Sequence, residues 1–150
     1  MSYRDVFGEI LADHHESPRN WGKIEGATQE EKGYNPLCGD QVAICLKLNG
    51  RQLEQCTFEG EGCSICMASA SIMTEKVQGR DLEEIERLIE AFRKKMQGAE
   101  QVEGLPGDDE DDDLVALYGI KRFPVRIKCA LLPWTTLKKG LEHANVRKES

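Results

Sequence analysis

The chain has 150 residues, of which 39% are hydrophobic and 31% charged, and its formal net charge is −7. This length is enough for one domain with a sizeable core, and no apolar run approaches the roughly 20 residues that a membrane span needs. The acidic run at 108–113 carries most of the net charge, which therefore says little about the rest of the surface. We expect one domain over residues 1–150 that binds neither nucleic acid nor membrane.

The chain contains 6 cysteines, a number that would indicate disulfides in a short secreted protein. Its first residues run directly into amphipathic sequence, without the apolar segment of a signal peptide. We therefore expect a cytoplasmic protein with reduced thiols.

Apolar residues at helical spacing predict an amphipathic helix over about residues 2–14. His14 and His15 close this helix, where an imidazolium interacts favourably with the helix dipole. That role is the simpler interpretation, with metal ligation by His14 as an outside candidate. Residues 21–34 show no clear period and are expected to form an extended or irregular approach to the turn at Cys38.

Alternating apolar residues predict a strand over 41–48, and Asn49-Gly50 is a strong signal for a hairpin turn into a second strand over 51–59. A two-residue turn at Asn49-Gly50 would place Ala43 opposite Cys56. Cysteines within strands usually pack as small hydrophobes. We interpret Cys56, and likewise Cys45, as packing residues.

Gly60 and Gly62 permit a tight corner before a helix of small residues over 68–77. Cys63 and Cys66 lie at the start of this helix, where free N–H groups and the helix dipole favour thiolates. A capping pattern at Asp81 predicts a further helix to about residue 97.

Residues 98–113 are rich in glycine and acidic side chains and predict a long loop, followed by a short helix or turn over 114–118. Pro124 favours the start of the last helix, to about residue 143, with a kink or restart at Pro133. Arg126 and Cys129 are three residues apart and share one face of that helix. Arg126 is therefore a candidate to balance negative charge near Cys129, with a solvated surface arginine as the alternative.

Cys38 and Asp40 lie two residues apart in a turn that Pro36 and Gly39 favour. A thiol and a carboxylate that converge in this way suggest a metal, but a closed zinc site needs four ligands. Cysteines in two other segments can complete the set, although spacing alone is weak support. The candidate ligands are Cys38, Asp40, Cys63 and Cys129.

Three segments resemble the cysteine motifs of the IscU/NifU-N family: 35–40 (NPLCGD), 60–69 (GEGCSICMAS) and 126–129 (RIKC). The resemblance extends over about residues 3–141. Within the family the chain is most similar to the SufU branch, because Lys128 precedes the third cysteine where IscU scaffolds carry a histidine. The acidic insertion at about 98–118 has the same implication.

The resemblance implies an α+β, SufE/IscU-like fold, in which helices pack against a small antiparallel sheet. It implies Zn²⁺ bound by the four candidate ligands, with Cys38 as the sulfur acceptor. A SufS-type cysteine desulfurase would supply persulfide sulfur, and SUF scaffold proteins downstream would receive it for iron–sulfur cluster assembly.

Three alternatives remain open from the sequence. The same thiolates could assemble a transient iron–sulfur cluster, as in an IscU-type scaffold. Cys63 and Cys66 could serve a thiol oxidoreductase of the CxxC type. The zinc could also have a purely structural role. Cys66 stands where SufU sequences often have serine, so its participation is an open question.

Overall fold

The computed structural model describes residues 5, 7–98 and 111–149 and contains one antiparallel sheet in this part of the chain. Its strands, in spatial order, are β1 (Gln29–Asn35), β2 (Asp40–Asn49) and β3 (Gln52–Glu61). The helices are α2 (Glu9–Glu16), α3 (Ser64–Val77), α4 (Leu82–Met96), α5 (Asp112–Tyr118) and α6 (Ile127–Glu149), with short 3-10 turns η2 (Gly119–Arg122) and η3 (Pro124–Arg126). The predicted α+β class is confirmed.

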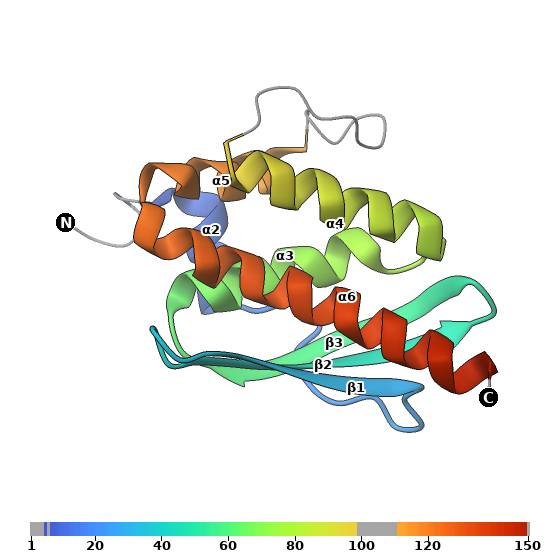
Figure 1. The fold of residues 1–150 in the computed structure, drawn as a ribbon. Helices are drawn as coiled ribbons and strands as arrows, with labels where there is room; N and C mark the ends of the chain where they lie inside the picture. Colours follow the sequence, from blue (N-terminus) through green and yellow to red (C-terminus); the bar gives the residue numbers. More distant parts are fainter. Residues whose placement is uncertain (1–4, 6, 99–110, 150) are drawn as a thin grey trace.

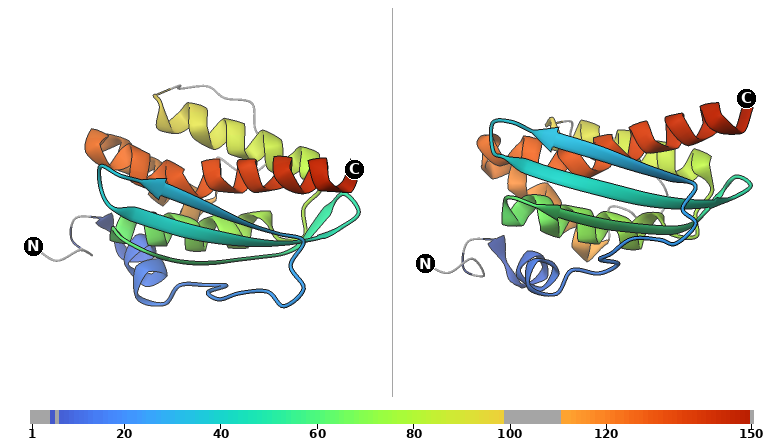
Figure 2. Two further views of the ribbon diagram at one scale, coloured as in Figure 1. Left: turned by 60° about the horizontal axis from the view of Figure 1, so that its bottom comes forward. Right: turned by 90° about the horizontal axis from the view of Figure 1, so that it is seen from below.

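The elements form layers (Figure 1). Helices α3 and α6 pack side by side on one face of the sheet, and α4 packs on α6 from the far side. Among the described residues, no helix covers the opposite face of the sheet (Figure 2). The β1–β2 turn, the β3–α3 corner and the start of α6 consequently meet at one end of the molecule (Figure 1).

Aromatic and polar contacts join α6 to α4 and to α3. Trp134 of α6 stacks on Phe92 of α4 with ring centroids 4.2 Å apart. The indole N–H of Trp134 donates to Ser69 Oγ of α3 at 3.0 Å, and that hydroxyl donates to the Ala130 carbonyl at 2.6 Å. These buried hydrogen bonds fix α3 against α6, because breaking them would leave the Trp134 N–H and the Ser69 hydroxyl buried without partners.

The segment expected to be extended or irregular over 21–34 is extended in its second half, where it forms the regular strand β1. The β1 sequence, QEEKGYN, is polar and lacks the apolar alternation that marks a strand, since it forms the edge of the sheet. Helix α6 packs closely on it, and a side chain at Gly33 would collide with Thr136.

The predicted hairpin exists, but its predicted register is wrong. Ala43 lies opposite Glu59 rather than Cys56, because the turn residues are Gly50-Arg51 rather than Asn49-Gly50 and because the ladder shifts by one residue between Lys47 and Leu48. A one-residue irregularity of this kind changes every pairing beyond it. Both Cys45 and Cys56 are buried, as expected of packing residues.

Helix boundaries differ from the predictions at several points. Among the described residues, α2 begins after Gly8, whose φ of 90° interrupts the expected longer helix. Helix α3 begins four residues earlier than expected, and α6 continues through Pro133 without the predicted restart. Residues 99–110 of the predicted acidic loop lie outside the described residues, and the expectation of one domain over 1–150 stays a prediction.

Candidate metal and thiol site

The turn between β1 and β2 presents Cys38. Asn35 ends β1 opposite Asp40, and its backbone carbonyl accepts the N–H of Gly39 at 2.8 Å. The Asn35 side chain also accepts the Leu37 N–H at 3.2 Å, which closes the turn from inside. Gly39 has a φ of 72°, a conformation that favours glycine. Cys38 is half-buried at the tip of this turn.

Asp40 is the first residue of β2 and is fully buried. Its Oδ1 accepts the backbone N–H of Cys63 at 2.7 Å, whereas its Oδ2 is buried without a hydrogen-bond partner. A buried carboxylate oxygen without a partner is costly unless a cation neutralises it. The Asp40 carboxylate is therefore suited to act as a metal ligand.

The corner between β3 and α3 carries Cys63. A Cβ added at Gly62 would lie 2.5 Å from Asp40 Oδ1, so only glycine permits this close approach of the two segments. Cys63 caps α3, and its sulfur accepts the N–H of Ile65 at 3.3 Å. Arg126 Nη1 also lies 3.5 Å from the same sulfur.

Cys129 lies in the first turn of α6 and is fully buried. Its Sγ is 3.5 Å from Cys38 Sγ, and both cysteines are free. Two thiolates on one zinc are about 3.8 Å apart, given Zn–S bonds of about 2.3 Å. Burial is the main cause that raises the pKa of the Cys129 thiol, and the neighbouring side chains of Asp40 and Cys38 add to it. A metal ion would therefore have to displace its proton.

The structure brings together three of the four predicted ligands. The ligand atoms of Cys38, Asp40 and Cys129 lie within 4.8 Å of one another. The backbone N–H of Cys63 donates to Asp40, but the Cys63 sulfur is not one of the three grouped ligand atoms. The unpartnered Asp40 Oδ2 and the two adjacent sulfurs fit a soft divalent cation such as Zn²⁺. The full ligand set and the metal's identity stay predictions.

Arg126 is the one predicted support residue at the site. It ends η3, is exposed, and its guanidinium is the group that faces Cys63. The charge of Cys63 raises the pKa of Arg126. Lys128, two residues on, is also exposed.

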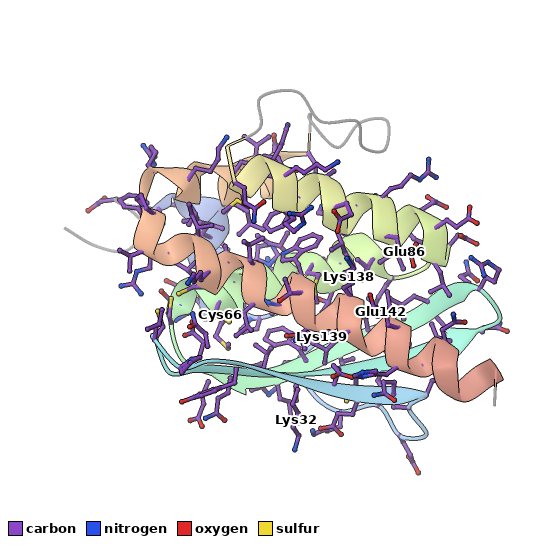
Figure 3. The ribbon with its side chains drawn as sticks, viewed as in Figure 1. Lys32, Cys66, Glu86, Lys138, Lys139 and Glu142 are labelled. Atoms are coloured by element: carbon purple, nitrogen blue, oxygen red, sulfur yellow. The ribbon has the colours of Figure 1, made fainter. Side chains whose placement is uncertain are left out.

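Cys66 differs from the candidate ligands, because its side chain is fully buried in the first turn of α3 (Figure 3). Burial, with the charge of Asp40, raises the pKa of its thiol. The βαβ unit of a thioredoxin-like fold does not occur among the described strands, which are all antiparallel. Both observations weigh against the CxxC oxidoreductase.

Sequence reasoning did not foresee the contacts that two residues make at the site. Asn35 organises the turn through its side chain, and the Asn-Pro dipeptide was the available signal. Gly62 permits the approach to Asp40, which became visible only once β2 and β3 were paired.

Comparison with known proteins agrees with this geometry. Residues 6–148 match the NifU-like N-terminal domain. The chain belongs to this family. A zinc-dependent sulfurtransferase SufU of Bacillus subtilis is 41% identical over 138 residues, which cover 91% of this chain and 89% of the relative. The iron-sulfur cluster assembly scaffold protein IscU of Thermotoga maritima is 36% identical, over 95% of this chain and 96% of the relative.

Solved structures of the family share the fold. A crystal structure of a putative iron-sulfur cluster assembly scaffold protein for the SUF system, from Fervidobacterium islandicum, superposes with a TM-score of 0.82 at 31% identity. The match covers 93% of this chain and 99% of that chain. The family resemblance of the three cysteine segments is confirmed. None of the described helices is long and apolar enough to cross a membrane.

Proposed function

We propose that this protein is a zinc-dependent sulfurtransferase that accepts persulfide sulfur on Cys38 from a SufS-type cysteine desulfurase. The observation that carries the proposal is a half-buried thiol at the tip of a turn, beside Cys129 and the unpartnered oxygen of Asp40. The 41% identity to a zinc-dependent sulfurtransferase SufU supports it.

Cys38, Asp40, Cys63 and Cys129 would hold the zinc. When bound, zinc keeps thiols deprotonated at neutral pH and, having no redox chemistry, protects them without oxidising them. Asp40 orients the site, since its Oδ1 is fixed by the Cys63 N–H and its Oδ2 remains available to the metal. Arg126 offsets negative charge at Cys63, which makes it a positioning residue.

Cys38 is the proposed sulfur acceptor because it is the more accessible thiol of the adjacent pair. Cys129 is fully buried, whereas Cys38 follows Leu37, whose side chain is 78% exposed at the turn. The Cys38 thiolate attacks the outer sulfur of the desulfurase persulfide. A new S–S bond forms on Cys38, the S–S bond of the donor breaks, and the desulfurase cysteine leaves as a thiolate.

The desulfurase would dock at this end of the molecule. Leu37 and Val125 are both 78% exposed. Leu37 directly precedes Cys38 in the sequence, and Val125 directly precedes Arg126. Exposed apolar side chains beside a reactive thiol suit a protein partner. SUF scaffold proteins downstream would receive the sulfur.

An iron–sulfur scaffold is the second candidate, because several relatives carry that name and the same thiolates suit a transient cluster. Metal analysis of protein purified without chelator separates the two functions. We expect zinc and a colourless protein, and we expect Cys129→Ser to lose the zinc. Iron with visible absorbance would support the scaffold, and a protein with neither metal would refute the site.

A further inference from the structure

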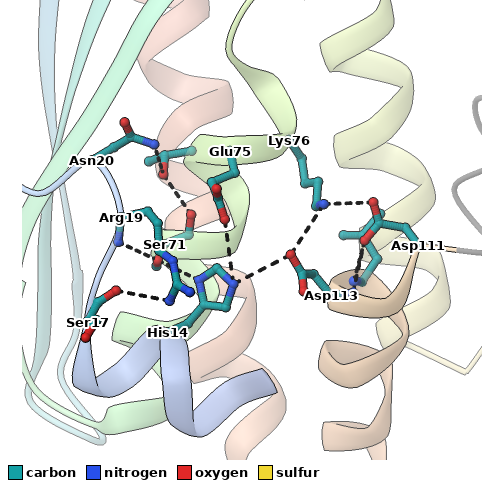
Figure 4. A network of polar contacts seen from close by, with 11 residues as sticks. His14, Ser17, Arg19, Asn20, Ser71, Glu75, Lys76, Asp111 and Asp113 are labelled. Carbon is teal, nitrogen blue, oxygen red and sulfur yellow. Dashed lines mark hydrogen bonds and ion pairs between the residues drawn. The ribbon is translucent and has the colours of Figure 1, made fainter. Parts of the chain in front are cut away.

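A second cluster of potential ligands lies away from the cysteines, where α2, α3 and α5 meet (Figure 4). His14 of α2 is 3% exposed, and its Nε2 faces two carboxylates. Glu75 Oε1 of α3 lies 3.7 Å from this nitrogen, and Asp113 Oδ2 of α5 lies 3.6 Å from it. All three ligand atoms lie within 4.8 Å of one another.

These separations suit a shared cation better than direct hydrogen bonds. Both N···O distances exceed the range of about 2.7–3.2 Å for hydrogen bonds to nitrogen. Two ligand atoms on one tetrahedral zinc are about 3.4 Å apart, given bonds of about 2.1 Å. The two separations that include His14 Nε2 would need to shorten by only a few tenths of an ångström for the side chains to share an ion.

The other ring nitrogen of His14 supports this role. Nδ1 lies 2.7 Å from Ser71 Oγ, and the same oxygen accepts the backbone N–H of Arg19 at 2.8 Å. When Nδ1–H donates to Ser71, the Nε2 lone pair points at the carboxylates. Metal-binding histidines are oriented by a second hydrogen bond of this kind.

Lys76 is a positive charge beside the cluster, but it lies closer to Asp111 than to the cluster residue Asp113. Lys76 Nζ lies 2.8 Å from Asp111 Oδ2 and 3.4 Å from Asp113 Oδ2, so its shorter contact is with Asp111. Burial, followed by the charge of Arg19, lowers the pKa of His14, while the charges of Asp113 and Glu75 act in the opposite direction.

We propose that His14, Glu75 and Asp113 form a second binding site for a divalent transition metal ion of the zinc class. One imidazole with two carboxylates suits such ions, and three protein ligands leave a fourth position for water. The side chains of Glu75 and Asp113 are 40% and 27% exposed, which gives the ion a path from solvent. The bound ion would link α5, and with it the end of the acidic run, to α2 and α3.

Calorimetric titration with Zn²⁺ tests the proposal, using the full chain with its thiolate site already loaded. We expect one further equivalent of zinc. Glu75→Gln should weaken this equivalent at least about tenfold, and so should His14→Ala. Glu75→Gln is the main variant, because its side chain is partly exposed and its loss leaves the core intact. His143→Ala is the matched control, since His143 Nδ1 contacts the single carboxylate of Glu31 at 2.7 Å and should leave the titration unchanged.

Titration with Co²⁺ separates this site from the cysteine site, because thiolate ligation gives near-ultraviolet charge-transfer bands that nitrogen and oxygen ligands do not. The second equivalent should add only weak visible bands, and these should disappear in Glu75→Gln. Absence of a second equivalent in the unmodified chain, or equal binding by Glu75→Gln, would overturn the proposal.

Discussion

Asp40 illustrates how one side chain can serve the backbone and a metal at once. Its Oδ1 fixes the start of α3 through the Cys63 N–H, and its Oδ2 faces the site without a partner. The sequence placed Asp40 in a turn with Cys38 and so predicted a ligand. The sequence could not indicate that one carboxylate oxygen accepts a hydrogen bond while the other has no partner. The hydrogen bond comes from Cys63, which is more than twenty residues away in the chain.

Replacing Asp40 separates these two tasks. Asp40→Asn can still accept the Cys63 N–H but loses the charge, so zinc affinity should fall at least about tenfold while the metal-free protein stays folded. Asp40→Ala should in addition destabilise the metal-free protein by about 1–3 kcal/mol, because it leaves the Cys63 N–H without an acceptor. Competition with a chelator and urea denaturation measure the two effects. Unchanged zinc affinity in Asp40→Asn would show that the carboxylate is not a ligand.

At the scale of elements, the sequence predicted those with strong periodicity and missed those without it. Helix α4 begins after Asp81, as the capping pattern indicated. Strand β1 was expected only as an extended or irregular segment, because its polar residues give no period. The hairpin register was wrong because the turn residues are Gly50-Arg51 and because the ladder shifts between Lys47 and Leu48. Pairing between strands and packing against α6 decide both features, and neither is local in the sequence.

The β3–α3 corner gives a prediction at this scale. Gly62 has a φ of 135°, and a side chain there would also meet Asp40. Gly62→Ala should therefore cost roughly 3 kcal/mol or more and weaken metal binding. Gly79→Ala is the matched control, since Gly79 has a φ of 83° but open space around it, and should cost only about 1 kcal/mol. Equal losses of stability in urea denaturation would show that the approach to Asp40 does not constrain the corner.

The contact between α4 and α6 gives a prediction about pH. Glu90 of α4 accepts hydrogen bonds from Arg93 and from Lys138 of α6, which lower the pKa of Glu90 from 4.5 to about 2. Between pH 4.5 and about 2, Glu90 therefore binds a proton more readily in the unfolded chain than in the folded one. The stabilisation is present above pH 4.5 and is lost as pH falls toward 2. Because the side chain is 36% exposed, its contribution should be below about 1 kcal/mol.

Glu90→Gln tests this effect. It should lower the unfolding free energy slightly at pH 7, and the difference from the unmodified chain should shrink as pH falls below 4.5. Glu86→Gln on the exposed side of α4 is the control and should change little at either pH. A difference that stays constant down to pH 2 would show that the ion pairs do not depend on ionised Glu90.

At the scale of the whole molecule, the sheet and the inner helices bring three separate segments to one end (Figure 1). The predicted α+β fold is confirmed, and it rested on the cysteine segments rather than on the sum of local predictions. Spacing alone gave no reason for Cys38 and Cys129, which are distant in the chain, to lie 3.5 Å apart. Only the paired strands and the packing of α6 on them explain that contact.

The central claim is that Cys38 accepts sulfur, and mass spectrometry tests it most directly. The zinc-loaded protein is incubated with a SufS-type cysteine desulfurase and cysteine, and the modified peptide is then identified. We expect one added sulfur on Cys38, no transfer to Cys38→Ala even where zinc remains, and full transfer to Cys66→Ser, whose zinc content should be unchanged. Added sulfur on the buried Cys66, together with an active Cys38→Ala variant, would contradict the claim.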